Sequence, residues 1–361
     1  MTDHEAYIAF NMTEKVGSAT LAPLVASAGS VAAAWEAYPA KTARKGGEVD
    51  WQDEIRRARD FGVEIVTPAD EGYPASLASV SGRPLALYVK GSVAALSKPM
   101  VAMVGTRKAS SYGLEQADRI AYDLAYSGWA VVSGLALGID AASHRGALKA
   151  GGVTVGVIGS ALDRFYPEEN RELAREIVKN GGAVVSQFPF GRPPDQRTFP
   201  IRNAVVAALS RGVIAVECPT GSGTLITAAD AADLGRTVMA VPSRVDSKAG
   251  AGCLKLIRDG AVLVRNARDV EEALSELIPG RAPAAPAAKR KTAMSAGGDM
   301  PLYTVEEAMI MRHVDGDGVS VDVLSSKTGF PVAKVNSLTM TLRLKGRLRF
   351  LPGNRVASIN G

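Results

Sequence analysis

The segment Pro219–Ala228, with the sequence PTGSGTLITA, has the residue types of an anion-binding turn. It follows the apolar run Gly212–Val216, which predicts a buried strand, and leads into an alanine-rich stretch that predicts a helix. The first N–H groups of a helix have no partner inside it, and the helix dipole adds positive potential there. The segment lacks the lysine of the ATPase phosphate loop. We therefore expect it to hold an anionic group without acting as an ATPase loop.

Two other predicted strand-to-helix connections carry glycines beside charged residues. In Val104–Gly113, Gly105 lets the backbone approach a ligand closely, and Arg107 can bind a phosphate through two nitrogens. In Ser133–His144, Asp140 stands where the N-cap of the next helix is expected. A glycine at such a turn can also serve the turn alone, and Asp140 can be only a cap. One loop of this kind by itself says little about function.

The remaining two connections add aromatic and basic side chains. Gly159–Asn170 contains Phe165 and Tyr166, whose rings can stack on a base, and Ser186–Asn203 combines arginines with phenylalanines. The latter are Arg192, Arg197, Arg202, Phe188, Phe190 and Phe199. Ligands of an open parallel sheet bind outside the carboxyl ends of the strands, so all five connections should line one site. Arginines, free N–H groups and interleaved rings together predict binding of single-stranded nucleic acid.

A dinucleotide cofactor is the competing ligand for such a sheet, and the sequence does not favour it. Its fingerprint is G-x-G-x-x-G directly after a strand. The connection after the first predicted strand has one leading glycine, Gly105, and Ile226 stands where a third glycine would follow Gly221 and Gly223. The histidines and cysteines are too few and too scattered for a recognisable metal site. We therefore expect neither a cofactor nor a metal.

The scaffold for these connections is predicted by apolar runs that alternate with helical patterns. The predicted strands are Met100–Val104, Ala130–Val132, Val153–Ile158, Ala183–Val185, Val213–Val216, Val238–Val241 and Ala261–Val264. The predicted helices cover residues 112–126, 140–149, 168–180, 201–209, 224–235, 252–259 and 268–277. Strands this uniformly apolar are covered by helices on both faces. The pattern predicts an α/β fold with a doubly wound, mostly parallel, Rossmann-like sheet.

Two smaller domains are predicted to flank this core, which spans residues 85–278. Residues 1–84 predict a small helical domain, SAM-like or helix-hairpin-helix-like, in which Met12–Val25 either contacts a DNA phosphate or is a packing module with Gly17 as a helix C-cap. The Pro-, Ala- and Gly-rich residues 279–300 predict a flexible linker.

Residues 301–361 have the order of a winged helix, in which a helix and a helix-turn-helix precede a two-strand wing turned at Pro352–Asn354. From Lys327 to the end there are seven basic residues and no acidic ones. This domain is suited either to reading DNA or to packing on a partner protein.

Composition limits the class of protein. A length of 361 residues predicts two or three domains. The net charge of +5 is compatible with a nucleic-acid partner but is shared by many enzymes. Residues Met1–Glu5 are acidic where a signal peptide is basic, and no apolar stretch reaches the roughly 18–20 residues of a membrane helix. We expect a cytoplasmic protein that does not enter the membrane, with Cys218 and Cys253 as buried thiols.

Taken in order, the loop sequences resemble the DNA processing protein A family (DprA, also called Smf). The resemblance rests on VGTRKASSYG, SGLALGIDAASHRGAL, GVIGSALDRFYPEENREL, FPIRN and GSGTLITAADAADLGR, and it covers most of Leu85–Val264. It implies a non-enzymatic protein of natural transformation that binds single-stranded DNA and loads the RecA recombinase onto it. It also implies a homodimer formed through the Rossmann-like core.

The resemblance further implies which residues contact DNA. The family's Gly-Thr-Arg, Y-P-x-x-N, F-P-x-R-N and S-G-T-x-x-T-A signatures all have counterparts in this sequence. The expected DNA-binding residues are Gly105, Thr106, Arg107, Lys108, Ser133, Gly134, Gly138, Tyr166, Asn170, Arg202, Asn203, Gly221, Ser222, Gly223, Thr224 and Thr227. Gln187, Ala204 and Ser243 depart from the usual Glu, Arg and Gly of the family.

The same core also resembles the lysine-decarboxylase-like phosphoribohydrolases, which cleave the glycosidic bond of a nucleotide. Those enzymes carry P-G-G-x-G-T-x-x-E, and Thr227 stands where their glutamate would be. A threonine can neither stabilise an oxocarbenium-like centre by charge nor act as a base near neutral pH. We expect the Glu217 carboxylate to be bonded to a backbone N–H or paired with an arginine. We expect His144 to be either a structural residue or a DNA contact. We expect binding without catalysis, and nucleotide cleavage is the alternative.

Overall fold

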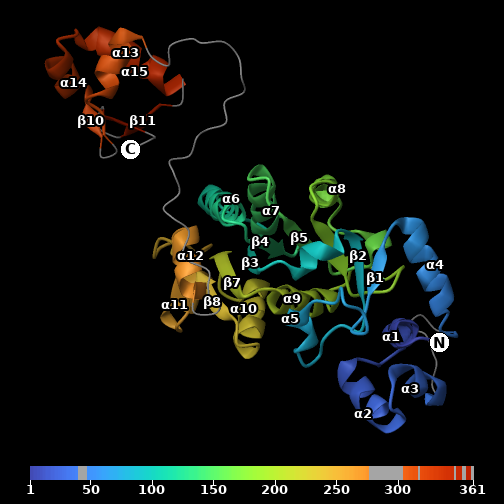
Figure 1. Ribbon diagram of the computed structural model, residues 1–361. Coiled ribbons are helices and arrows are strands. Elements are labelled where there is room, and N and C mark those ends of the chain that lie inside the picture. Colours follow the sequence, from blue (N-terminus) through green and yellow to red (C-terminus); the bar gives the residue numbers. More distant parts are fainter. Residues whose placement is uncertain (40–46, 276–303, 316–317, 345–346, 352–354, 359–361) are drawn as a thin grey trace. The chain divides into compact units, whose positions relative to one another are not determined.

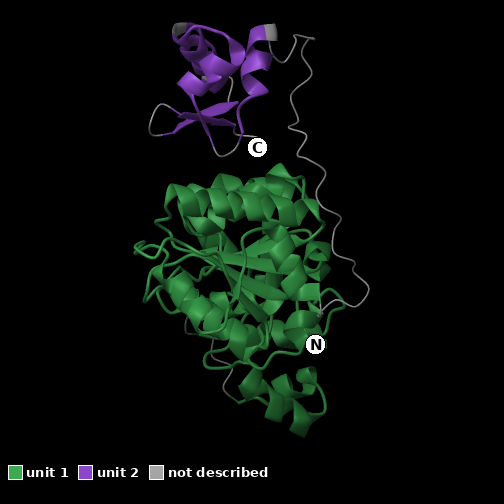
Figure 2. Cartoon of the chain, turned by 90° about the vertical axis from the view of Figure 1, so that its left-hand side faces the viewer, with its two compact units in different colours: residues 1–287 green, residues 288–361 purple. Residues whose placement is uncertain are grey.

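The computed structural model describes residues 1–39, 47–275, 304–315, 318–344, 347–351 and 355–358. The chain divides into two compact units, Met1–Ala287 and Ala288–Gly361 (Figure 2). The predicted linker 279–300 and the predicted wing turn lie outside the described residues. Within the described ranges, no single helix is long and apolar enough to cross a membrane. A pair of short helices, Ser18–Ala28 and Val31–Ala37, passes that test only together, and the chain bends by 93° between them.

A nine-stranded sheet organises the described part of the first unit, in the order β1-β2-β6-β5-β4-β3-β7-β8-β9 (Figure 1). The strands are β1 Glu64–Val66, β2 Leu87–Gly91, β3 Met100–Gly105, β4 Ala130–Ser133, β5 Thr154–Val157, β6 Ala183–Ser186, β7 Gly212–Glu217, β8 Thr237–Ala240 and β9 Val262–Leu263. Strands β3 to β9 pair in parallel, whereas β2 runs antiparallel to both β1 and β6. The chain steps outward from β3 to β6 and then returns to place β7 beside β3. This reversal makes the β3–β7 edge the topological switch point of the sheet.

Helices cover both faces of the sheet (Figure 1). One layer contains α6 Ser111–Tyr126, α7 Ile139–Lys149, α8 Arg171–Lys179 and α12 Ala267–Leu274, and the other contains α5 Ala75–Ala78, α9 Thr198–Leu209 and α10 Gly223–Asp233. Helix α11, Ala251–Arg258, packs on β7 and β8. Because successive strand residues point to opposite faces, Val101 and Met103 of β3 pack under α6, while Ala102 and Val104 pack under α9. The predicted α/β class and the mostly parallel sheet are confirmed.

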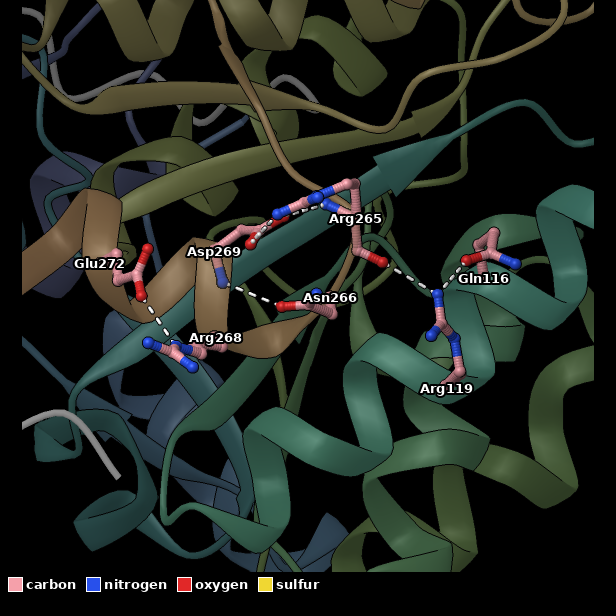
Figure 3. Close-up of polar contacts among 7 residues, drawn as sticks. All are labelled: Gln116, Arg119, Arg265, Asn266, Arg268, Asp269 and Glu272. Carbon is pink, nitrogen blue, oxygen red and sulfur yellow. Dashed lines mark hydrogen bonds and ion pairs between the residues drawn. The ribbon is translucent and has the colours of Figure 1, made fainter. Parts of the chain in front are cut away.

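Polar contacts attach the last helix of the core to α6 (Figure 3). The guanidinium of Arg119 donates to the carbonyl of Arg265 at 2.9 Å, just before α12 begins. Asn266 caps α12 by accepting from the N–H of Asp269 at 3.0 Å. The Asp269 carboxylate pairs with the Arg265 side chain at 2.9 Å. These arginines are therefore occupied by contacts within the chain.

The N-terminal residues form the helices α1 Asp3–Met12, α2 Ser18–Ala28, α3 Val31–Ala37 and α4 Trp51–Phe61. The rings of Phe10 and Trp35 meet edge to face at 5.1 Å in a small core of their own. The prediction that Gly17 ends a helix is wrong, because Thr13 caps α1 and Gly17 is the N-cap of α2. The helical prediction also missed β1, a strand of three residues that extends the large sheet. The domain boundary near residue 84 stays a prediction.

The second unit has the predicted winged-helix order. Its elements are α13 Val305–Met311, β10 Val319–Ser320, α14 Val321–Thr328, α15 Val332–Leu344, β11 Leu348–Leu351 and β12 Arg355–Ser358. The strands form a small sheet in the order β10-β12-β11. Ile310, Leu324 and Val335 from the three helices are fully buried against Leu348 and Val356 of the wing strands. The apolar side chains of this short segment therefore form a hydrophobic core of their own.

Candidate nucleic-acid interface

A cavity of about 530 Å³ opens at the switch point, where the loops after β3 and β7 meet. We call it the switch-point cavity. Most of the predicted DNA-binding residues line it, namely Gly105, Thr106, Arg107, Lys108, Gly134, Arg202, Asn203, Ser222, Gly223, Thr224 and Thr227. Pro219, the first residue of the predicted anion-binding segment, lines it as well, and so does Ala249, which no sequence motif predicted because alanine has no polar side chain. The structure thus brings loops from four separate parts of the chain to one site.

The turn after β7 leaves room for a ligand at the start of α10. Ser222 is the N-cap of this helix, and its hydroxyl accepts from the N–H of Thr224 at 3.1 Å. Gly221 has a φ of +76°, and a Cβ built on Gly221 or on Gly223 would meet no atom within 4 Å. The space next to the first N–H groups of the helix is therefore open to an anion.

Two glycines on the opposite wall have a packing role instead. A Cβ on Gly105 would lie 2.8 Å from the carbonyl oxygen of Glu217. A Cβ on Gly134 would lie 2.7 Å from the Asp140 carboxylate and would also collide with Arg202. For these two positions, the alternative that the glycine serves only the turn is the one that the structure supports.

Arg202, on α9, is buried and holds the loop after β4 by hydrogen bonds. It is 5% exposed, and its Nη1 donates to the carbonyls of Gly134 and Val157. Its Nε donates to the side-chain oxygen of Asn203 at 3.1 Å. Burial lowers the pKa of Arg202 to about 10, while the nearby Asp140 carboxylate opposes this shift and the charge of Arg107 adds to it. The side chain therefore holds the wall of the cavity and also contributes positive potential behind it.

Asp140 does not occupy the predicted N-cap position. Gly138 is the N-cap of α7, and Asp140 is the second residue of the helix. Its carboxylate accepts from the N–H groups of Gly134 at 3.1 Å and Ala136 at 3.3 Å. Burial raises the pKa of this carboxyl, and the charge of Arg202 opposes the rise. Asp140 thus fixes the same loop that Arg202 holds from the other side.

Arg107 and Lys108 are the exposed cations of the switch-point cavity. The guanidinium carbon of Arg107 lies 5.2 Å from the centre of the Phe199 ring. Neither side chain takes part in an ion pair with another described residue. Asp140 is the one acidic side chain among the described residues that line the cavity. The cavity therefore has an excess of positive charge that a phosphate would neutralise.

Two aromatic rings, the exposed Tyr166 and the half-buried Phe199, lie beside the cavity in a small crevice that Arg107 also lines. Tyr166 is 43% exposed, and its ring centre is 6.1 Å from that of Phe199. Phe190, which the sequence offered as a stacking ring, is only 2% exposed and packs edge to face on Tyr88 at 5.6 Å. The aromatic surface next to Arg107 is therefore made by Tyr166 and Phe199.

Three other predicted residues act on the loops from inside the protein. The Ser133 hydroxyl donates to the carbonyl of Met103 at 2.6 Å and is fully buried. The Asn170 amide donates to the carbonyls of Leu135 at 2.9 Å and Ala136 at 3.0 Å. Gly138, with a φ of +76°, passes close to the backbone of the loop after β3. The structure gives these residues a positioning role.

The groups that an enzyme would need are engaged elsewhere. Glu217 is 2% exposed and accepts from the N–H of Ser110 at 2.7 Å and from its hydroxyl at 2.6 Å. The expectation of a carboxylate bonded to backbone N–H is confirmed. Thr227, at the position of the hydrolase glutamate, is 2% exposed and bonds back to the carbonyl of Gly223 at 3.4 Å.

His144 and the two cysteines are buried away from solvent. Nδ1 of His144 lies 2.6 Å from the hydroxyl of Thr154, which itself donates to the carbonyl of Val131. Burial lowers the pKa of His144 to about 3. Of the two roles left open for His144, the structural one fits its burial. Cys218 and Cys253 are buried thiols, as expected, with their sulfur atoms 3.7 Å apart.

Comparison with known protein families gives two matches along the chain. The family described as DNA recombination-mediator protein A matches residues 64–275. The DprA winged helix domain matches residues 282–354. The first match covers the nine-stranded sheet and all the loops of the switch-point cavity. The second begins in the predicted linker and includes the elements of the small C-terminal core up to β11.

Similar sequences and structures carry related names. Protein Smf of Escherichia coli is 35% identical over 290 residues, which are 80% of this chain and 76% of that protein. DNA processing protein DprA of Bacillus subtilis is 37% identical over 219 residues, which are 60% of this chain and 73% of that protein.

Two solved structures share the fold. DprA of Streptococcus pneumoniae superimposes with a TM-score of 0.63 at 30% identity over 75% of this chain and 98% of that one. A structure of DprA from Helicobacter pylori, described for its single-stranded DNA binding mode, gives a TM-score of 0.53 at 28% identity over 59% of this chain and 96% of that one.

Proposed function

Because the chain belongs to the DNA recombination-mediator protein A family, we propose that it binds single-stranded DNA in the switch-point cavity without cleaving it. The names of its relatives support a role in DNA recombination or transformation. The Helicobacter pylori relative supports single-stranded DNA as the ligand. The observation that carries the proposal is the exposed Arg107, which faces the open start of α10 across one cavity.

Each part of the cavity meets a different part of a DNA strand. The guanidinium of Arg107 and the N–H groups of Gly221 and Gly223 bind phosphate oxygens, the first by charge-assisted bonds and the second at a helix N-terminus. The buried charge of Arg202 strengthens the potential without touching the ligand. Tyr166 and Phe199 offer ring faces to a base, and a base in a duplex is already stacked and paired. The arrangement therefore favours unpaired DNA.

The direct test is fluorescence anisotropy with a labelled oligo-dT across a salt series. We expect the affinity to fall steeply as salt rises, because bound phosphates release counterions. We also expect weaker binding to a duplex of the same length. Affinity that does not respond to salt, or that is higher for the duplex, contradicts the proposal.

Nucleotide cleavage is the alternative activity, and the chemistry of the cavity argues against it. A glycosidic bond is cleaved with the help of a carboxylate that can reach the sugar. Asp140 is 6% exposed and bonded to two N–H groups, and Glu217 is turned toward Ser110. Incubation with AMP followed by chromatography should show no free adenine above the level of a protein-free control. Catalytic release of adenine would establish the hydrolase function.

The proposal extends to a homodimer formed through the core. Strand β9 ends the sheet, and its side chains Val262 and Leu263 are 41% and 45% exposed. An edge strand with exposed apolar side chains is suited to pairing with a second copy. Light scattering should give the dimer mass for the wild type and the monomer mass for Leu263→Arg. A monomeric wild type at tens of micromolar would refute this part of the proposal.

We further propose that the protein acts in the cytoplasm and loads the RecA recombinase onto the strand it holds. Support comes from the family membership, since such a mediator must hand over DNA without altering it. The test is RecA filament formation on oligo-dT covered by single-strand-binding protein, with and without this protein. Equal rates in both reactions would contradict RecA loading and leave DNA binding unaffected.

A further inference from the structure

A second cavity, of about 410 Å³, lies beside α8 on the outer part of the core. We call it the α8 pocket. Its walls come from the end of α4, from β2 and β6, and from the loop after β5. It shares no lining residue with the switch-point cavity. The DNA-binding proposal therefore gives this pocket no role.

The interior of the α8 pocket is apolar and partly aromatic. Leu162, Ala174 and Val178 line it together with the rings of Phe61 and Phe165. Phe61 is 41% exposed, although burying a phenylalanine ring away from water lowers the free energy of the protein. An exposed ring inside a cavity of this size is an anchor site for one apolar side chain of a ligand.

The rim of the pocket is entirely basic. Lys90, Arg171, Arg175 and Lys179 line it, and no described acidic residue does. The spacing of Arg171 and Arg175 on α8 places both on one face of the helix, together with Val178. Lys90 lies 4.4 Å from the Phe61 ring centre, and Arg171 lies 5.3 Å from the Phe165 ring centre. The charges are thus held directly beside the apolar interior.

Three of these cations, Arg171, Arg175 and Lys179, are available to a ligand, whereas Lys90 donates to the backbone carbonyl of Phe61 at 2.6 Å. Arg171 and Arg175 pair with Glu168 and Glu172, whose side chains are 70% and 71% exposed. Exposed ion pairs of this kind are weak in water, so a ligand carboxylate can replace Glu168 or Glu172 as the partner of the arginine. Lys179 makes no ion pair with any residue in the described part of the chain. The rim can therefore bind several carboxylates of a ligand without breaking any buried ion pair.

We propose that the α8 pocket binds an acidic segment of a partner protein, with one large apolar side chain in the pocket and carboxylates on its rim. Separate carboxylates around an apolar anchor match four cations around an apolar cavity. A DNA strand, whose phosphates would meet the same cations, is the competing occupant, and the oligo-dT titration described below distinguishes the two. The pocket is a protein-docking site separate from the DNA site.

The probe is a fluorescein-labelled peptide, Asp-Asp-Asp-Leu-Phe, measured by anisotropy against the full chain. We expect saturable binding that is lost when glycine replaces the peptide's Phe or when lysine replaces its Asp residues. The variant Arg175→Glu/Lys179→Glu should weaken binding at least tenfold. The control variant Lys255→Glu/Arg258→Glu changes two exposed cations in the last turn of α11 and should bind the peptide like the wild type.

Phe61→Ser provides a second test that leaves every charge in place, and it should weaken peptide binding severalfold. Because the Phe61 ring also packs on Phe190 at 5.8 Å, the melting temperature of the variant is measured and binding is compared at a temperature where both proteins are folded. Absence of saturable binding below millimolar peptide overturns the proposal, as does equal binding of the glycine-substituted peptide. Oligo-dT is titrated against the same variants. If Arg175→Glu/Lys179→Glu weakens oligo-dT more than the peptide, the α8 pocket is a nucleic-acid site and the peptide proposal is wrong.

Discussion

At the switch-point cavity, Arg107 and Lys108 are exposed beside an open helix start and make no ion pair with a described residue, whereas Lys334 on α15 of the winged helix bonds to Glu306 at 2.5 Å and lies over the Phe330 ring. Arg343 lies 5.0 Å from the Phe350 ring, much as Arg107 lies 5.2 Å from the Phe199 ring. The winged helix is the more basic segment by sequence, yet the proposed anion site lies in the core, where two cations without ion pairs stand beside an open helix start. The comparison teaches that the surroundings of a cation, more than the number of cations, locate a phosphate site.

The same comparison extends to the exposed face of α15. Val332 and Met340 are 43% and 51% exposed there, and Asn336 and Ser337 lie on the surface between them. A helix that reads DNA usually presents arginine, lysine or several amides to the groove. Arg343, one turn after Met340, is also exposed, so the face of α15 combines apolar, polar and basic side chains and fits either a DNA groove or a protein surface. Both regions can be tested by removing one at a time.

The largest effect is expected for Arg107→Ala. The change removes a charge-assisted contact to phosphate, worth roughly 1.5–3 kcal/mol, so affinity for oligo-dT should fall more than tenfold. The melting temperature should hardly change, because the Arg107 side chain is exposed and makes no ion pair with a described residue. Anisotropy and thermal melting measure the two quantities. Arg258→Ala is the control, and equal affinity of Arg107→Ala and wild type would remove Arg107 from the site.

The next largest effect is expected for Gly223→Leu. A side chain at this position enters open space, so the fold should tolerate it while the volume next to the α10 N–H groups is filled. We expect a loss of about tenfold in oligo-dT affinity, comparable to one phosphate contact. Gly223→Ala should have a smaller effect, and the difference between the two variants reports on steric exclusion. If leucine leaves the affinity intact, the phosphate does not bind at this turn.

A smaller effect is expected when residues 302–361 are deleted. The core contains the switch-point cavity, and the deleted part forms a compact unit of its own. Oligo-dT affinity should change less than about threefold, in line with the loss of a few surface charges outside the switch-point cavity. A loss larger than that of Arg107→Ala would reverse the comparison and make the winged helix the main DNA reader.

The smallest effect on binding is expected from pH between 7 and 5, because arginine and lysine stay charged in this range. Stability should respond more. The pKa of His144 is lowered to about 3 in the folded protein, whereas an unfolded histidine titrates near 6.5. The unfolded chain thus binds a proton that the folded protein does not, and the free energy of unfolding falls as pH falls below about 6.5. Urea melts should show that His144→Gln loses less stability than the wild type over this interval.

The sequence predicted the sheet from β3 to β9 because those strands are continuous apolar runs with helical patterns between them. It missed β1, since three residues give no usable periodicity and the strand exists only by pairing with β2. The switch-point cavity could be predicted because the topology gathers strand ends at one edge. The sequence could not predict that Gly138, and not Asp140, is the N-cap of α7. The position of Asp140 depends on the loop that Arg202 holds from α9, a helix far away in the sequence.

The rings illustrate the same limit. Phe190 and Phe199 lie in one loop, and nothing in their local sequence says which ring is buried. Phe190 is buried against Tyr88 of β2, whereas Phe199 lies beside Arg107 at the crevice. Long-range packing therefore separates a core ring from a stacking ring.

The loop after β4 has its carbonyl groups tied down from inside the protein. Arg202 donates to the carbonyl of Gly134 in this loop, as well as to that of Val157 at the end of β5, and Asn170 donates to the carbonyls of Leu135 and Ala136. With its acceptors already occupied, this wall has no rearrangement to make when a strand arrives. Capture should therefore follow simple bimolecular kinetics, with an observed rate that rises linearly with oligonucleotide concentration and no plateau from a slow closing step.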